Sequence, residues 1–191
     1  MSKFCFNEKK ATQLAAAFIE RSGGVLNYMK LTKLMYMADR AALVGWARPI
    51  TGDAYLAMKH GPVLGETYSM ISDGQSPASD SYWFNYVERT GKYNVALLQP
   101  CPPSNLSEAE RTIIDEIFER YGHYDKWELV DHLHEILPEW SHPGIGCFSI
   151  SMRDILTAEG FSSDQATEVE EEMISLHEAK ILLGCASSDS H

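Results

Sequence analysis

The densest group of side chains that could do chemistry lies in residues 30–63. The segment holds five cations, two carboxylates and one histidine: Lys30, Lys33, Asp39, Arg40, Arg48, Asp53, Lys59 and His60. General acid–base catalysis uses histidine and carboxylates together, so one hypothesis is an enzyme site near Asp39, Asp53 and His60. The alternative is that these groups hold local turns together, because buried polar groups normally find hydrogen-bond partners. We favour the alternative, since nothing in the sequence sets the mutual geometry of the three side chains.

Recognised catalytic and metal-binding motifs do not occur in the chain. There is no G-x-S-x-G elbow, H-E-x-x-H pair, phosphate loop or dinucleotide-binding fingerprint. His132 and His134 lie two positions apart on a predicted helix, about 200° around its axis, so they cannot hold one metal ion from the same face. The four cysteines are scattered without a C-x-x-C pair, which argues against a zinc site or a disulfide framework. We therefore expect no catalytic residues, no metal and no cofactor.

One predicted helix must position much of the polar group, and it begins after Asn27, a suitable N-cap residue. Its apolar residues recur at helical spacing: Leu31, Leu34, Met35, Ala38 and Ala42. Lys30, Lys33 and Arg40 fall on a different face. That face is either solvated or turned towards an acidic partner or a buried carboxylate, and the sequence leaves both interpretations open.

The rest of residues 30–63 contains a turn and a short strand. Thr51-Gly52-Asp53 is a turn sequence, and residues 55–59 alternate in a way that predicts a half-buried strand. His60-Gly61-Pro62 is expected to begin the next helix, because proline suits the first helical position.

The remaining chain is predicted to be mainly helical. Gly91 lies in a turn between two apolar runs and predicts a hairpin, while Ser107 and Asp125 are predicted helix N-caps. The predicted segments are 8–21 (helix), 82–98 (hairpin) and 107–183 (a helical second half). We therefore predict an α+β fold, mainly helical, with a small antiparallel β-sheet of about three strands.

Length and composition favour one globular domain. The chain has 191 residues, of which 45% are hydrophobic, enough to bury a real core. We predict a single domain over residues 1–184 and a flexible tail over residues 185–191. No apolar run approaches the roughly 18 residues of a membrane span, and no signal-peptide pattern opens the chain. These features, with the unpaired cysteines, predict a cytoplasmic protein that does not bind membranes.

The charge is distributed unevenly along the chain. The net charge is −11, made up of +5 in residues 1–60 and −16 in residues 61–191. An acidic surface repels phosphates, so nucleic-acid binding through the acidic C-terminal half is not expected. Residues 155–163 faintly resemble a helix-turn-helix, but residues 159–172 carry six acids and no cation. The basic N-terminal part could meet an acidic protein.

Several sequence segments together resemble one known family. The segments KLTKLMYMADR, RPITGD and MKHGPV, with Tyr55 between the last two, resemble the core signature of the SocA-like antitoxin family. This family carries the Panacea domain, formerly a domain of unknown function, and has phage-associated relatives. The hairpin around Gly91 and the Trp127-Glu-Leu segment also resemble it, so the likeness covers about residues 10–160. Thr32 departs from the pattern, where a longer polar residue is expected.

The resemblance implies a non-catalytic antitoxin that neutralises a cognate toxin by protein–protein binding. It also implies a possible role as a proteolytic adaptor that hands the toxin to a protease unfoldase. Under this hypothesis the partner-binding residues are Lys30, Lys33, Asp39, Arg40, Arg48, Asp53, Lys59 and His60. The alternatives are an enzyme with an unrecognised site near Asp39, Asp53 and His60, or a phage-associated interaction protein without a toxin.

Overall fold

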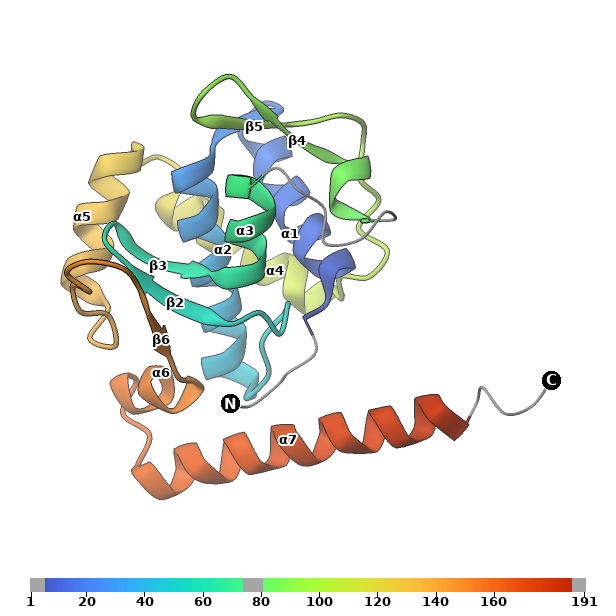
Figure 1. Ribbon diagram of the computed structural model, residues 1–191, viewed down its shortest axis with the longest axis vertical. Coiled ribbons are helices and arrows are strands. Elements are labelled where there is room, and N and C mark those ends of the chain that lie inside the picture. Colours follow the sequence, from blue (N-terminus) through green and yellow to red (C-terminus); the bar gives the residue numbers. More distant parts are fainter. Residues whose placement is uncertain (1–5, 74–80, 187–191) are drawn as a thin grey trace.

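The computed structural model describes residues 6–73 and 81–186, with the side chains of the last helix described up to residue 176 and at residues 178 and 179. Within these residues the chain forms seven α-helices and two three-stranded antiparallel sheets (Figure 1). The predicted α+β class is therefore confirmed. The strands differ from the prediction in forming two small sheets rather than one. The proposed tail falls mostly on residues 187–191, outside the described residues, and the division into one domain over residues 1–184 stays a prediction.

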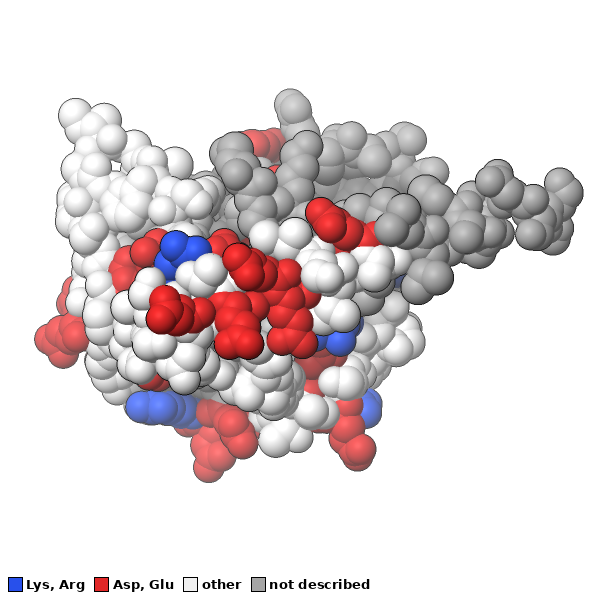
Figure 2. All heavy atoms as spheres, turned by 90° about the horizontal axis from the view of Figure 1, so that it is seen from below, with Lys and Arg blue, Asp and Glu red and all other residues white. Residues whose placement is uncertain are grey.

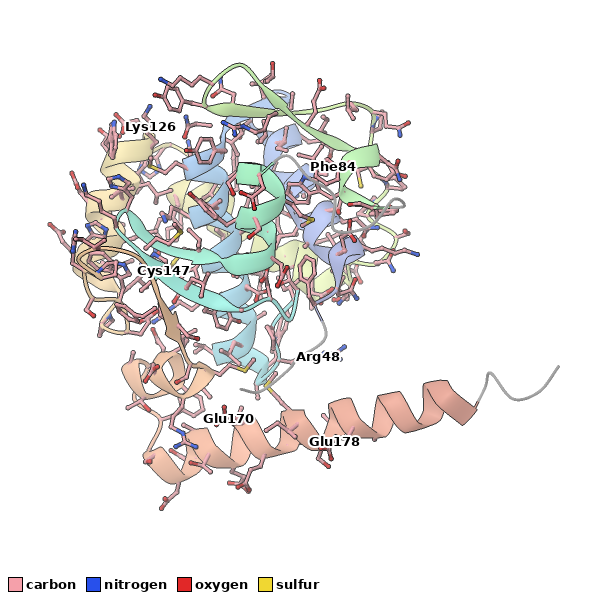
Figure 3. All side chains as sticks on the ribbon, viewed as in Figure 1. Arg48, Phe84, Lys126, Cys147, Glu170 and Glu178 are labelled. Carbon is pink, nitrogen blue, oxygen red and sulfur yellow. The ribbon has the colours of Figure 1, made fainter. Side chains whose placement is uncertain are left out.

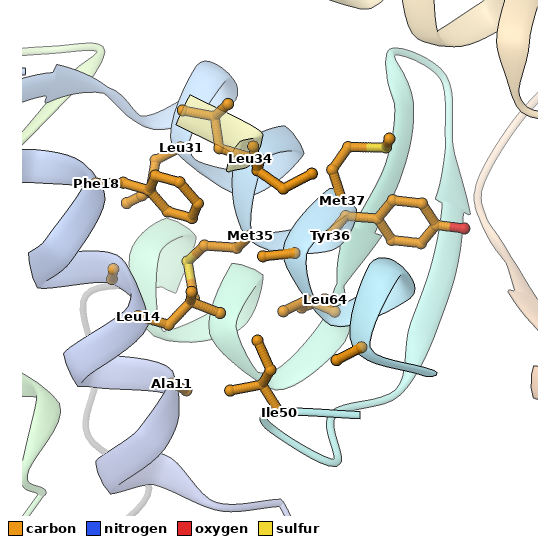
Figure 4. Close-up of a cluster of buried hydrophobic side chains, with 14 of the residues drawn as sticks. Ala11, Leu14, Phe18, Leu31, Leu34, Met35, Tyr36, Met37, Ile50 and Leu64 are labelled. Carbon is orange, nitrogen blue, oxygen red and sulfur yellow. The ribbon is translucent and has the colours of Figure 1, made fainter. Parts of the chain in front are cut away.

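The core forms around α2 (Tyr28–Trp46), which packs against α1 (Glu8–Arg21) and α4 (Glu108–Tyr121). Figure 4 shows apolar side chains of α1, among them Leu14 and Phe18, facing Leu34 and Met35 of α2. Every residue from Leu31 to Arg40 is buried, so the middle of α2 is covered on all sides. A helix buried on all sides belongs to the core rather than to the surface. The interpretation of the Lys33 and Arg40 face as solvated is therefore wrong.

The predicted N-caps are present at the helix starts. Asn27 accepts hydrogen bonds from the first amides of α2, and Ser107 forms a capping box with Glu110 at the start of α4. Asp125 caps α5 (Lys126–Ile136) in the same way, with Glu128 returning the second bond of the box. These caps satisfy amides that have no partner inside their own helix.

The first sheet has the strand order β1-β5-β4. It consists of β1 (Val25–Asn27), β4 (Val87–Thr90) and β5 (Asn94–Leu97), and β4 follows a short 3₁₀ helix, η1 (Trp83–Asn85). The hairpin predicted around Gly91 is β4–β5, with Thr90 opposite Asn94. This sheet lies beside α1 at the top of Figure 1.

The second sheet has the order β3-β2-β6, and its strands β2 and β3 come from the polar segment around residues 30–63. It consists of β2 (Tyr55–Met58), β3 (Gly61–Leu64) and β6 (Phe148–Ile150). The expectation that His60-Gly61-Pro62 begins a helix is wrong, because Gly61 and Pro62 pair with Met58 and Ala57 and the helix α3 (Gly65–Asp73) begins later. β3 lies at the edge of its sheet, a position that tolerates the missing amide of a proline.

The C-terminal part consists of α6 (Met152–Ala158) and the long helix α7 (Ser163–Ala186). α7 runs below the rest of the molecule and packs on α6 near its start (Figure 1). Figure 2 looks at this face from below and shows acids gathered on it. Five exposed acids of α7 are Asp164, Glu168, Glu171, Glu172 and Glu178. No helix among the described residues is long and apolar enough to cross a membrane.

Candidate functional site

Asp39 is a buried carboxylate that joins α2 to the turn before β2. It accepts hydrogen bonds from the Thr51 amide at 2.7 Å and from the Tyr55 hydroxyl at 2.9 Å. Burial raises the pKa of Asp39 to about 6, against the opposing effect of these hydrogen bonds. Each of the two carboxylate oxygens accepts a hydrogen bond from a nearby residue of the same chain, so Asp39 holds the turn in place.

Asp53 caps a helix from outside that helix. Its two oxygens accept from the amides of Ala54, Glu66 and Thr67 at 2.7, 2.8 and 2.9 Å, and from the Thr67 hydroxyl at 2.8 Å. The Glu66 and Thr67 amides are unpaired within α3 because they lie in its first turn, where a negative charge is favoured. Burial raises the pKa of Asp53, and the bonds from Thr67 and Glu66 oppose this shift. Asp53 therefore fixes the start of α3 to the end of the Thr51–Asp53 turn.

Lys33 is a lysine in the protein core. Its side chain is 1% exposed, and its ammonium nitrogen donates to the carbonyl oxygen of Pro62 at 2.8 Å. Burial lowers the pKa of Lys33 to about 7. Gly61 packs between Lys33 and His134. A Cβ atom added to Gly61 would lie 3.4 Å from Lys33 Nζ and 3.6 Å from His134 Nε2. The two nitrogens are therefore at most 7.0 Å apart, the sum of these distances.

Arg40 binds two glutamates that lie far away in the sequence. Its Nε and Nη2 donate to the two oxygens of Glu139 at 2.6 and 3.2 Å, and its Nη1 pairs with Glu159 at 2.7 Å. The Glu139 side chain is fully buried and also accepts from the Tyr36 hydroxyl at 2.9 Å. Burial lowers the pKa of Arg40, but the bonds and charges of both glutamates outweigh it and raise the pKa overall. Arg40 thus connects α2 to the segment after α5 and to the end of α6.

The other predicted site residues lie nearer the surface. Lys30 is half-buried and donates to the carbonyl oxygen of Gly122 at 2.6 Å, and burial lowers its pKa. Arg48 is exposed just beyond the end of α2, and Figure 3 shows it at the end of the molecule near α7. Lys59 and His60 are exposed at the tip of the β2–β3 hairpin.

The structure does not bring His60 together with the two aspartates. Asp53 precedes β2 and His60 follows it, and an extended strand of four residues separates its ends by roughly 13 Å. The His60 ring instead meets the ring of Trp127, with centroids 5.3 Å apart at 78°. Asp39 and Asp53 are brought together through Thr51, whose amide donates to Asp39 and whose hydroxyl accepts from the Asp53 amide at 3.1 Å.

A second histidine, His134, lies near Lys33. The His134 ring stacks on Trp140 with centroids 3.8 Å apart, and the Trp140 indole donates to the carbonyl oxygen of Met58 at 3.1 Å. The Nε2 of His134 is buried and has no hydrogen-bond partner within the described part of the chain. Across the described residues, no group of three His, Cys, Asp or Glu side chains is arranged to hold a metal ion.

Three residues of this polar arrangement have no signal in the local sequence: Glu139, Glu159 and Trp127. Glu139 lies between Pro138 and Trp140, about a hundred residues from its partner Arg40, and no local pattern indicates such a pairing. A buried cation needs a carboxylate partner, but the burial of Arg40 is itself decided by the tertiary structure. Trp127 is 48% exposed at the start of α5.

A family model described as "Antitoxin SocA-like, Panacea domain" matches residues 31–141 of the chain. The matched segment contains α2 from Leu31 onward, the β2–β3 hairpin and the Asp39, Asp53 and Arg40–Glu139 contacts. Comparisons with curated proteins and with solved structures found no match.

Proposed function

This match covers more than half of the 191 residues, so the chain belongs to the SocA-like antitoxin family with a Panacea domain, and we propose that it neutralises a cognate toxin by direct protein–protein binding. The family match carries the proposal. It includes the whole second half of α2 and the hairpin that presents Lys59 and His60.

The contacts of the signature residues support a binding scaffold rather than an active site. Lys33, Asp39, Arg40 and Asp53 are buried, and each bonds to groups of its own chain. A catalytic acid or base must instead reach a substrate within hydrogen-bond distance. We therefore assign these four residues to the scaffold and keep the exposed residues Arg48, Lys59 and His60 as partner-binding candidates.

The decisive test is toxicity and its rescue. The reading frame next to this gene is expressed alone and then together with this chain in a bacterial host. The expected result is growth arrest in the first case and growth in the second, with both proteins recovered in one complex. Arrest that persists under co-expression would refute neutralisation. A neighbour that is harmless alone would instead favour an interaction protein without a toxin.

We also propose that the chain works in the cytoplasm and can act as a proteolytic adaptor. In that case the toxin should disappear faster when the antitoxin is present, and a host without its protease unfoldases should retain it. Occlusion without handover predicts the opposite, a toxin whose lifetime is unchanged or extended by the antitoxin in both hosts. The rate of toxin loss after synthesis is stopped distinguishes the two mechanisms.

A further inference from the structure

Aromatic rings and cations from three separate elements meet on the surface beside the β2–β3 hairpin tip. We call this surface the aromatic–cation patch, and it consists of Lys59, His60, Lys92, Tyr93, Lys126 and Trp127. The hairpin tip provides the first two residues, the β4–β5 hairpin the next two, and the start of α5 the last two. Figure 3 shows Lys126 at the start of α5, on the side of the β4–β5 hairpin.

Contacts between neighbouring side chains make the patch continuous. The Lys126 ammonium lies 5.5 Å from the centre of the Tyr93 ring and 5.7 Å from that of Trp127. Lys92 lies 5.1 Å from the Tyr93 ring, and Trp127 meets His60 at the hairpin tip. Single exposed aromatics are common on protein surfaces, but a contiguous group is typical of interaction sites.

The exposure of the rings suits a binding surface. Trp127 and Tyr93 are each 48% exposed, so about half of each residue's surface is open to a partner. Tryptophan and tyrosine are enriched among the residues that dominate binding energy in protein interfaces. Burial and the nearby charges of Lys59 and Lys33 lower the pKa of His60. The imidazole is therefore mostly neutral near neutral pH, and it adds aromatic surface and a hydrogen-bonding edge to the patch.

The charge of the patch favours an acidic partner. Three of its six residues are lysines, whereas the protein as a whole carries a net charge of −11. Asp125 and Glu128 lie at its margin and reduce the local excess of positive charge without reversing it. The same chemistry would attract single-stranded nucleic acid, but the acidic remainder of the surface, including the face in Figure 2, repels phosphates.

We propose that the aromatic–cation patch is the surface that docks an acidic segment of the cognate toxin, with Trp127 as its apolar anchor and Lys126 as its principal cation. This proposal rests on the proposed function for the identity of the partner. Attraction between the lysines and the partner's carboxylates adds to the association rate and makes binding weaker at high salt.

The test uses two variants of the patch and two matched controls elsewhere on the full chain. Trp127→Ala removes the anchor, and Trp46→Ala removes another tryptophan of nearly equal exposure, 46% against 48%, at the far end of α2. Lys126→Glu and Lys9→Glu each reverse a cation in the first turn of a helix, where the dipole accepts the new negative charge. The Lys9 ammonium also lies over an aromatic ring, that of Tyr82, at 5.8 Å. Thermal unfolding of each variant shows that it is folded.

Affinity for the purified product of the neighbouring reading frame is the first readout. Trp127→Ala and Lys126→Glu are each expected to weaken it at least about tenfold, and the two controls less than about twofold. Equal effects of the patch and control variants, with the toxin still bound and neutralised, would overturn the patch proposal and leave the proposed function standing. Failure of the wild-type chain to bind or neutralise any toxic neighbour would count against the proposed function instead.

A glutamate peptide and single-stranded oligo-dT of the same charge are the second readout, at low salt. Saturable binding of the glutamate peptide that is lost in Lys126→Glu and kept in Lys9→Glu supports an acidic partner even where no toxic neighbour exists. Binding of oligo-dT through Trp127, tighter than that of the glutamate peptide, would overturn the proposal in favour of a nucleic-acid surface. Absence of patch-dependent binding in both readouts also overturns it.

Discussion

Replacing the buried Lys33 by methionine is expected to change how the stability of the protein depends on pH. Burial lowers the pKa of Lys33 from 10.5 to about 7 in the folded state, while the unfolded chain keeps the ordinary value. Below about pH 7 both states carry the proton, so folding bears the full cost of burying an ammonium ion. Between the two pKa values only the unfolded state binds the proton. The free energy of unfolding therefore rises with pH across this window.

The magnitude follows from the two pKa values. At 1.36 kcal/mol for each pKa unit, the separation between them corresponds to about 5 kcal/mol in total. A two-state titration places about 2 kcal/mol of this between pH values of about 7 and 9, the range that is practical to measure. The lost hydrogen bond to the Pro62 carbonyl adds a cost of about 1 kcal/mol to the variant, and this cost does not depend on pH.

The assay is urea unfolding of the wild type and of Lys33→Met at several values between about pH 6 and 9. Subtracting the two free energies of unfolding removes the titration of every other group. The free energy of unfolding of the variant minus that of the wild type should fall by about 2 kcal/mol from about pH 7 to 9. Lys59→Met is the matched control, because Lys59 is exposed at the hairpin tip and its removal takes no charge out of the core.

Parallel pH curves for the wild type and Lys33→Met would refute the reasoning. They would mean that the Lys33 ammonium keeps its ordinary hydration in the folded protein. A second consequence concerns function, since a scaffold residue can be replaced without loss of binding. Lys33→Met should neutralise the toxin as well as the wild type does wherever it is folded, and loss of neutralisation in a stable variant would return Lys33 to the interface.

Three further predictions concern stability, each measured by denaturant unfolding. Gly61→Ala should lower the free energy of unfolding by about 2 kcal/mol or more, because the φ of +97° disfavours a side chain and the new Cβ would lie 3.3 Å from a carbon of Lys33. Gly91→Ala is the control and should lower it less, because the space around Gly91 is open. Burial raises the pKa of Asp39 from 3.8 to about 6, so its ionisation should lower the stability of the wild type relative to Asp39→Asn by about 3 kcal/mol in total, of which about 2 kcal/mol falls between about pH 4 and 6. Equal slopes of the two stability curves would contradict this. Arg40→Met should lower the free energy of unfolding by about 3–5 kcal/mol, because it leaves the buried carboxylate of Glu139 unpaired. Arg48→Met, at an exposed position, is the control and should change it by less than about 0.5 kcal/mol.

The helices were predictable because their signals are local. Asn27, Ser107 and Asp125 cap the helices they were expected to cap, since a side-chain oxygen and an amide three residues later meet whatever the rest of the chain does. The hairpin at Gly91 was predictable for the same reason, because a turn residue between two short strands acts over a few residues.

The strand over residues 61–64 was not predictable from its own residues. Proline after glycine suits a helix start as well as an edge strand, and the choice depends on pairing with β2. β2 in turn pairs with β6, whose residues 148–150 lie about ninety positions later. No local signal specifies which of the three short strands shares a sheet with which.

In the candidate site, too, some features follow from the local sequence and others from the tertiary structure. The sequence by itself determined which polar residues cluster in residues 30–63, where the helices capped by Asn27, Ser107 and Asp125 begin, and the likeness to an antitoxin family. Spacing, capping and motif order are properties of neighbouring residues. Only the tertiary structure decided that Lys33, Asp39, Arg40 and Asp53 point inward while Lys59 and His60 stay exposed. It also brought Glu139 to Arg40 and Trp127 to His60. The physical reason is that burial and pairing depend on groups distant in sequence. A cation on a helix has the same local pattern whether water or a glutamate a hundred residues away is its partner.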